Sequence, residues 1–281
     1  MKKYLSLIKF SHTIFAMPFA LIGFFLAQTN QFEWKILFYI VLCMVFARSS
    51  AMAFNRYIDR NIDKKNPRTA TIREIPSGKI SPKNALLFTF INVLLFITTT
   101  YFINPLCFLL SPVALIIILG YSLTKRVTYL CHLILGLGLS LAPLGSYIAV
   151  TGRFDILPIL FSLSVLFWVS GFDIIYALQD EEFDKAENLY SIPVKIGVKN
   201  SMVISKFLHF IALITLLFTG LIYDFGIYYF IGLLIFSFLL VYQHLIIKPN
   251  DLSKVNLAFF TTNGIASIIF GIFVIIDVLI R

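Results

Sequence analysis

The sequence predicts an all-α membrane protein, a bundle of about nine transmembrane helices arranged as two related four-helix units plus one helix. Of its 281 residues, 59% are hydrophobic and only 13% are charged, whereas a soluble domain carries about 25% charged residues. The apolar residues gather in stretches of about 20, the length that spans the hydrocarbon core of a bilayer. These stretches are apolar on all sides instead of alternating, which excludes a β-barrel.

Nine predicted spans follow one another along the chain. They cover residues 12–28, 34–54, 84–103, 105–123, 129–151, 155–178, 201–222, 225–247 and 255–279. Lysines precede the first span as in a signal peptide, but no small-residue cleavage site follows it, so we expect it to remain as the first helix. The spans leave no room for a soluble domain of ordinary size. Residues 1–281 are therefore predicted to form a single transmembrane domain.

The basic residues are distributed unequally between the two ends of the spans. Of 23 Lys and Arg, three (Lys35, Arg153 and Arg281) lie on one side, Arg48 lies within a span, and the other 19 lie on the side of the N-terminus. The positive-inside rule places that side in the cytoplasm and the C-terminus outside, and we expect a bacterial inner membrane. The net charge of +9 then reflects orientation, and no nucleic-acid partner is expected.

Two long cytoplasmic loops, at about 55–83 and 179–200, resemble each other. The first contains Ile75-Pro76, Lys79-Ile80 and Lys83-Asn84, and the second contains Ile192-Pro193, Lys195-Ile196 and Lys199-Asn200. Each loop follows an acidic cluster at the end of a span, and the two clusters are four spans apart. This pattern indicates an internal duplication of a four-helix unit.

The acidic clusters have helical spacing. Asn55, Asp59 and Asp63 are spaced by four residues, and Asp173, Asp180 and Asp184 by seven and four, so each set would share one helix face. Like charges at that spacing repel, and a divalent cation would remove the repulsion. Mg²⁺ is commonly held by one or two carboxylates together with substrate phosphates. Nearby Lys and Arg residues either bind phosphate oxygens or form a solvated cytoplasmic face.

Two ionisable residues lie inside predicted spans, where they are costly and usually functional. Asp173 falls in the cytoplasmic half of its span. Arg48 lies two helical turns before Asn55 on the same face, where it either pairs with an aspartate or binds an anionic group of a substrate. The histidines (His12, His132, His209 and His244) lack metal-ligand spacing, and for each we expect a hydrogen bond between helices instead of a catalytic role.

Three segments carry a resemblance to a known family. They are NRYIDRNID at 55–63 with the following NPRTA and REIPSG, YSLTKRVT at 121–128, and DIIYALQDEEFD at 173–184. In this order they resemble the first aspartate-rich motif, the tyrosine- and lysine-arginine-containing loop and the second aspartate-rich motif of the UbiA family of intramembrane prenyltransferases. Arg56 stands where that family has an acid, so it receives no metal role, and Ser122 stands where the loop often has proline.

The resemblance implies a set of site residues. Asp59, Asp63, Asp180 and Asp184 would hold Mg²⁺; Asn55, Arg68, Lys125, Arg126 and Lys185 would bind the diphosphate; Asp173 and Tyr176 would act near the allylic carbon. Arg48 would bind the acceptor's carboxylate. The implied reaction is Mg²⁺-dependent transfer of a polyprenyl group from polyprenyl diphosphate, within the lipid bilayer, to an aromatic acid.

Two further questions concern the substrate and the class of protein. The residues of these motifs are most similar to those of family members that act on 4-hydroxybenzoate in ubiquinone or menaquinone biosynthesis. The alternative is a hydroxynaphthoate acceptor of a menaquinone route. A secondary transporter of a cation or organic anion would also fit duplication, intramembrane charge and nine spans. Against a transporter, the acids cluster at the cytoplasmic ends of helices and not at the midplane.

Overall fold

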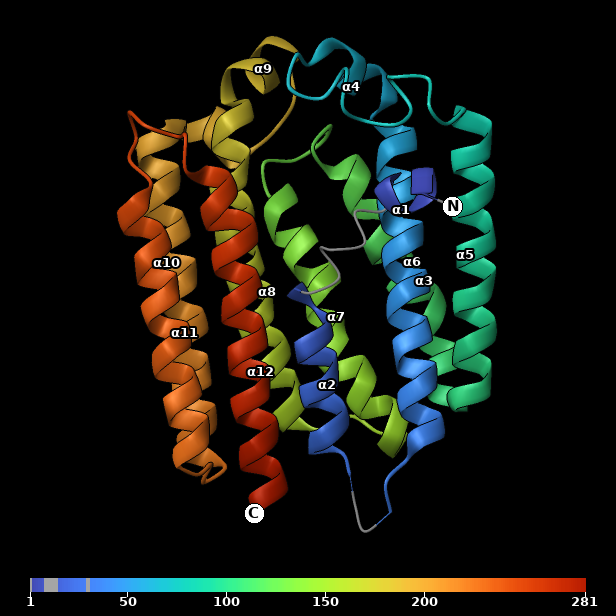
Figure 1. The fold of residues 1–281 in the computed structure, drawn as a ribbon, viewed down its shortest axis with the longest axis vertical. Helices are drawn as coiled ribbons and strands as arrows, with labels where there is room; N and C mark the ends of the chain where they lie inside the picture. The colour runs from blue at the N-terminus through green and yellow to red at the C-terminus, as the bar shows by residue number, and fades with distance from the viewer. Residues whose placement is uncertain (1, 8–14, 29–30) are drawn as a thin grey trace.

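A computed structural model of the protein describes residues 2–7, 15–28 and 31–281, and it confirms the predicted all-α membrane fold (Figure 1). Within those residues, β pairing is limited to one isolated bridge between Lys248 and Asp251. The elements are α1 (Lys2–Leu7), α2 (Met17–Leu26), α3 (Trp34–Ile58), α4 (Arg60–Lys65), α5 (Pro82–Ile103), α6 (Pro105–Thr124), α7 (Cys131–Thr151), α8 (Ile156–Ala177), η2 (Leu178–Asp180), α9 (Glu181–Ala186), α10 (Ile192–Ile222), α11 (Ile227–Ile246), η3 (Leu257–Thr262) and α12 (Asn263–Ile280).

Eight of the described helical segments are long and apolar enough to cross a membrane. The remaining predicted span, 12–28, corresponds to α2, which has only ten residues; residues 12–14 lie outside the described part of the chain. At 1.5 Å per residue, α2 is about 15 Å long, roughly half of a hydrocarbon core. Pro18 occupies its first turn, where proline is tolerated because its missing N–H has no partner there. The described α2 is therefore shorter than the predicted span.

Two helix boundaries differ from the predicted ones for local reasons. Helix α10 begins at Ile192 and not at 201, because a short helix precedes the membrane span and joins it at Gly197, whose φ of 77° and ψ of 166° are not helical. Glycine is the residue that adopts this conformation without steric cost. Before α12, residues 257–262 form a π-helix, and the Asn263 side chain donates to the Ala258 carbonyl at 2.9 Å.

The two predicted repeat units have the same order of elements. In each, a membrane helix leads into a short helix and a loop before the next membrane helix: α3, α4 and α5 in the first, and α8, α9 and α10 in the second. When the two loops are aligned, Ser81 matches Gly197. Ser81 is the N-cap of α5, and Gly197 is the point at which the long part of α10 begins. Both α4 and α9 lie at the same end of the bundle (Figure 1).

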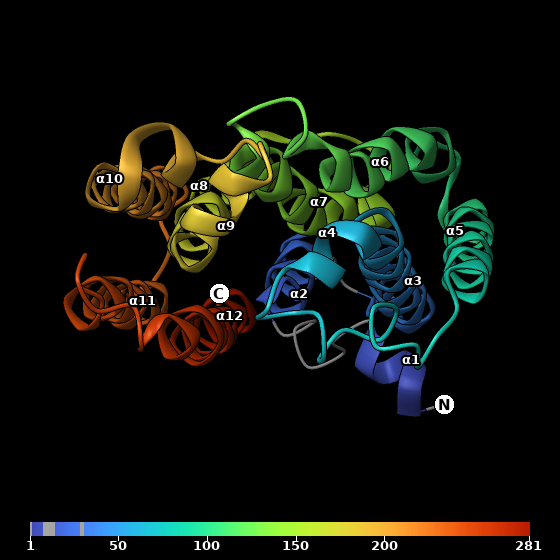
Figure 2. The same cartoon turned by 90° about the horizontal axis from the view of Figure 1, so that it is seen from above.

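The membrane helices are arranged around α2 and α7. Helix α7 packs against α8, α8 against α10, α3 against α5, and α11 against α12, while α2 contacts α7 and α12. Seen from above, α3, α5 and α6 lie to one side, and α8, α10, α11 and α12 to the other (Figure 2). The short helices α4 and α9 cover this end of the bundle, above the two groups.

The largest buried cluster joins the second group of helices to α2. Trp168 of α8 is fully buried among Phe19, Phe172 and Phe236, and its indole N–H donates to the Asn263 side chain at 3.0 Å. A buried indole usually finds such a partner. On the same side, His209 and His244 are hydrogen-bonded to each other at 2.8 Å between α10 and α11, as predicted for these histidines; His12 lies outside the described residues.

Candidate active site

The two acidic clusters meet at one end of the bundle, where α4 and α9 are neighbours (Figure 1). The Asn66 side-chain amide, after α4, donates to Asp180 Oδ1 at 3.1 Å. Arg68 forms an ion pair with the same carboxylate and donates to it from Nε at 3.0 Å. Further out, Lys65 Nζ lies 2.6 Å from Glu187 Oε2. Residues more than 100 positions apart therefore form one polar site.

Asp59 is the centre of the first half of this site. Its carboxylate is buried and accepts hydrogen bonds from Arg126 Nη2 at 2.7 Å and from the Asn55 amide at 3.1 Å. Lys125 Nζ is also 3.1 Å away. The loop between α6 and α7 thus supplies two cations to an aspartate that follows α3. The buried carboxylate thus has charged and polar partners in place of water.

Asp63 is paired within its own loop. Its carboxylate binds Arg73, while its second oxygen is buried without a partner in the part of the chain that the structure describes. Burial lowers the pKa of the Arg73 guanidinium, but the charge and hydrogen bond of Asp63, together with the charge of Asp59, outweigh burial and hold that pKa above its ordinary value. The chain bends at Asp59, yet the amide N–H of Asp63 still donates to the Asp59 carbonyl at 2.8 Å. The expected helical register of the first cluster is therefore nearly kept.

The second cluster extends from the surface toward the membrane. The Arg68 guanidinium lies over the ring of Tyr176, 5.0 Å from its centroid. One helical turn deeper on α8, Asp173 Oδ2 lies 2.7 Å from Nδ1 of His132 on α7. Asp184 lies on α9 and is partly buried, whereas Lys185 beside it is exposed and forms no ion pair within the described residues. The structure therefore connects Asp180, Tyr176 and Asp173 of this cluster through Arg68 and α8, and leaves Lys185 outside.

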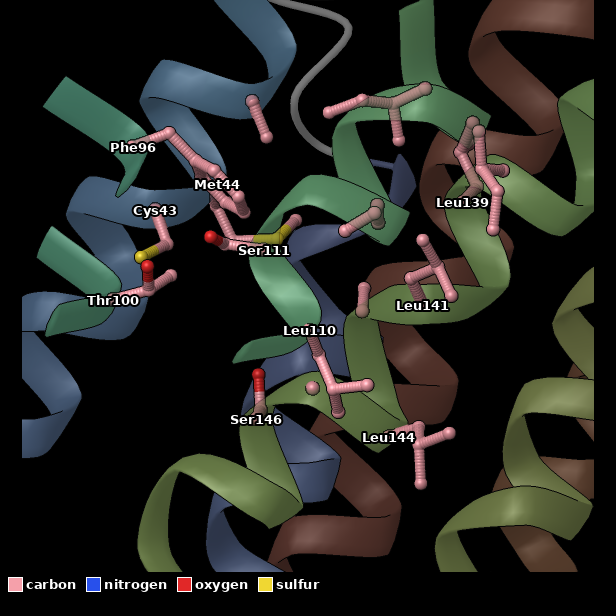
Figure 3. A pocket seen from close by; sticks show the side chains of 18 of the residues that line it. Cys43, Met44, Phe96, Thr100, Leu110, Ser111, Leu139, Leu141, Leu144 and Ser146 are labelled. Carbon is pink, nitrogen blue, oxygen red and sulfur yellow. The ribbon is translucent and has the colours of Figure 1, made fainter. Parts of the chain in front are cut away.

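Arg48 lies apart from the carboxylates, at an apolar cavity of about 310 Å³ enclosed mainly by α3, α5, α6 and α7. Its Nε is buried and has no hydrogen-bond partner among the described residues, and Tyr121 lines the same cavity. Of the two predicted roles, pairing with an aspartate is therefore not observed. The cavity extends along α6 from Tyr121 to Cys107, about 21 Å at 1.5 Å per residue. Figure 3 shows leucine side chains on its wall together with the hydroxyls of Thr100, Ser111 and Ser146.

The carboxylates fit a magnesium ion that is shared with a phosphate ligand. Among the described residues, no three His, Cys, Asp or Glu side chains converge on one metal position, and Asp59, Asp63 and Asp180 are each paired with a basic residue. Mg²⁺ prefers oxygen ligands and is usually held by one or two carboxylates plus phosphates and water. The unpartnered buried oxygen of Asp63 is a ligand of that kind.

Sequence reasoning did not identify the partners of three participants in the site. Asn66 and Arg73 lie within the first motif loop, and their ion-pair and hydrogen-bond partners depend on how the loop folds. His132 was assigned only a hydrogen bond between helices; the structure confirms that bond and shows that its partner is Asp173. The available signal was its position in the first turn of a span, at the same membrane end as Asp173.

The fold and the site together define a multi-pass membrane protein in which paired charges at one end of a helical bundle lie above an apolar cavity. The chain belongs to the UbiA prenyltransferase family, whose sequence model matches residues 16–265. This membership confirms the predicted resemblance and, with the eight apolar helices, an integral membrane protein. The extent of a single domain over residues 1–281 stays a prediction.

Two curated relatives and two solved structures illustrate the similarity. The chain is 34% identical to the 4-hydroxybenzoate octaprenyltransferase of Aliivibrio fischeri (strain MJ11) over 64% of this chain and 59% of the relative. It is 32% identical to that of Francisella tularensis subsp. novicida over 65% of this chain and 63% of the relative. The chain thus matches less than two thirds of the length of these relatives.

Among solved structures, the UbiA homolog from Aeropyrum pernix K1 superposes with a TM-score of 0.86 at 29% identity, covering 95% of this chain and 98% of that one. A UbiA homolog from Archaeoglobus fulgidus, bound to DMAPP and Mg²⁺, superposes with a TM-score of 0.76 at 22% identity, covering 99% of this chain and 100% of that one. The second likeness concerns the fold alone.

Proposed function

We propose that the protein transfers a polyprenyl group from polyprenyl diphosphate to an aromatic acid, with 4-hydroxybenzoate as the favoured acceptor. The observation that carries this proposal is the combination of two environments in one bundle: a cluster of paired charges at one end, and an apolar cavity lined by Arg48, whose Nε has no hydrogen-bond partner among the described residues. A donor substrate with a charged head and an apolar chain would fit the charge cluster and the cavity. An acceptor that carries a carboxylate would fit beside Arg48. The names of the curated relatives support the same acceptor.

The diphosphate would bind among the basic side chains that now neutralise aspartates. Arg68, Lys125 and Arg126 each lie beside a carboxylate and are partly exposed, so they can reach phosphate oxygens, which guanidinium groups bind in a bidentate manner. Asp59, Asp63, Asp180 and Asp184 would hold Mg²⁺. When bound, the ion would supply positive charge that stabilises the departing diphosphate. The exposed Lys185 would reach the site only from its rim.

The reaction would take place where the charge cluster adjoins the apolar interior. The bond between the allylic carbon and the diphosphate oxygen breaks, and its electron pair leaves with the diphosphate. The electron-rich ring carbon of the acceptor then forms a bond to the allylic carbon. The proton on that ring carbon passes to the Asp173 carboxylate, and the ring regains its aromaticity. Aliphatic walls exclude water from the allylic cation, and the ring of Tyr176 can stabilise positive charge nearby.

Arg48 would orient the acceptor by binding its carboxylate. Its Nε is buried and has no partner among the described residues, so an anion bound there would satisfy it. A hydroxynaphthoate has a carboxylate too, and Arg48 would bind it in the same way. We place the charge cluster on the cytoplasmic side of a bacterial inner membrane, because the basic loops lie at that end.

The experiment is prenyl transfer by the purified protein in detergent, with Mg²⁺ and a labelled polyprenyl diphosphate. Parallel reactions receive 4-hydroxybenzoate or a dihydroxynaphthoate, and each is repeated with EDTA. Product from 4-hydroxybenzoate alone that EDTA abolishes is the expected result. Product from the naphthoate alone would show that the acceptor is a naphthoate and would still support the proposed prenyl transfer. Absence of product with both acceptors would refute the proposed transfer to an aromatic acid. Uptake of a cation or organic anion that requires sealed vesicles would instead favour a transporter.

A further inference from the structure

The His132 ring connects three helices behind the deepest carboxylate of the site. It lies in the first turn of α7, and 4% of its side chain is exposed. Its Nδ1 is 2.7 Å from Asp173 Oδ2 on α8. Its Nε2 is 3.4 Å from the backbone nitrogen of Ile192 at the start of α10. Both ring nitrogens are therefore engaged, one by a carboxylate and one by a backbone amide.

These two contacts define where the ring proton lies. A backbone N–H can only donate, so Nε2 must present its lone pair to Ile192. A neutral imidazole has one N–H, which is then on Nδ1 and donates to Asp173. The backbone carbonyl of His132 separately accepts a hydrogen bond from the Ser170 hydroxyl at 3.2 Å, a contact between α7 and α8 that does not involve the ring.

The bond to His132 determines how Asp173 is presented. Within the described residues, hydrogen bonds engage Oδ2 of Asp173 but not Oδ1. Asp173 is three residues before Tyr176, so the two share one face of α8, and Tyr176 lies beneath Arg68 of the diphosphate region. Oδ1 of Asp173 is therefore left without a hydrogen bond among the described residues, on the side of α8 that also carries Tyr176.

We propose that His132 is a positioning residue, which holds the Asp173 carboxylate in an orientation in which Oδ1 accepts the proton released by the acceptor ring. This inference rests on the proposed function. The histidine neither gains nor loses a proton in the step: the proton moves from the ring carbon to Asp173, and the electrons of that C–H bond return to the ring. Its Nδ1–H bond stabilises the carboxylate before the transfer and keeps it from rotating away.

The test compares substitutions that keep or remove the donor. His132→Leu removes it, whereas His132→Asn places an amide N–H near the former Nδ1. Ser170→Ala is the matched control, because it alters the same contact between α7 and α8 without touching Asp173. We expect His132→Leu to lower kcat by at least about 10-fold with the donor's KM within about 2-fold of wild type, and His132→Asn to recover most of the loss. The Ser170→Ala variant should resemble wild type.

Two results would overturn the proposal: kcat of His132→Leu close to that of the wild type, or His132→Asn as impaired as His132→Leu. A second measurement needs no turnover. Nitrogen-15 NMR of histidine-labelled wild-type protein should show His132 protonated at Nδ1 and unprotonated at Nε2, and the opposite tautomer would refute the arrangement even if the variants fail to fold. If wild-type protein transfers no prenyl group, the proposed function fails, and the NMR result still decides the pairing.

Discussion

Replacing Arg48 with methionine should selectively impair the use of acceptors that carry a carboxylate. The substitution keeps a long, flexible side chain at the cavity wall and removes the charge. Arg48 forms no ion pair with the described residues, and its Nε is buried without a partner. Unlike most buried arginines, it can therefore be replaced without leaving an aspartate uncompensated, and we expect the variant to fold.

The size of the effect follows from the kind of bond that is lost. A hydrogen bond to a charged group contributes about 1.5–3 kcal/mol, which corresponds to a loss of about 10- to 150-fold in kcat/KM for the acceptor. A buried arginine can bind a carboxylate through two parallel bonds, so the upper half of that range is expected. The polyprenyl donor does not use Arg48 in this scheme, and its KM should stay unchanged.

The assay measures initial rates with 4-hydroxybenzoate and with its neutral methyl ester, for wild type, Arg48→Met and Met44→Leu. Met44 lines the same cavity from the same helix, so its volume-conserving replacement reports the effect of perturbing the wall alone. Arg48→Met should lose activity toward the acid and keep it toward the ester within about 3-fold. Equal losses for acid and ester, or a loss that appears in the donor's KM, would refute carboxylate recognition.

Three other predictions concern the charge cluster and the packing. Asp180→Asn should weaken Mg²⁺-dependent diphosphate binding by at least about 10-fold, measured by calorimetry, whereas Glu187→Gln, which alters the exposed ion pair, should change it little. Gly23→Ala should destabilise the protein by about 1–3 kcal/mol in denaturant unfolding, because its Cβ would lie 2.0 Å from the Pro143 carbonyl oxygen; Gly120→Ala, with open space, is the control. Finally, Mg²⁺ should bind weakly until diphosphate is added, and tight binding to the free protein would contradict this.

Much of the fold could be predicted because membrane helices are encoded locally. A stretch of about 20 apolar residues has few alternatives in a bilayer, where backbone groups must be satisfied within the segment. The expectations that failed depend on other interactions. The short helix before Gly197 belongs to the loop at the membrane surface, and its residues have no long apolar run. Similarly, α2 has ten helical residues within a longer apolar stretch, and hydropathy alone does not determine where such a helix begins.

The site could be predicted in outline but not in its pairings. Aspartates at helical spacing indicated which residues gather on each face, and the structure places both sets at one end. The sequence does not show that Arg68 reaches across to Asp180, because the two residues are more than 100 positions apart and their contact depends on how the repeat units pack. The same holds for His132 and Asp173. Each is polar within or beside an apolar stretch, which marks it as functional without identifying its partner.

The weak binding of Mg²⁺ predicted for the free protein follows from these pairings. Asp59 faces both Lys125 and Arg126, so a cation that approached it alone would meet two positive charges and gain little. When a diphosphate binds, its oxygens offer those cations another partner, and the aspartate charge becomes available to the metal. The binding free energies of metal and diphosphate are then coupled, and coupling is reciprocal: each must strengthen the other by the same factor. A site arranged in this way needs no preformed metal cage, which agrees with the lack of one among the described residues.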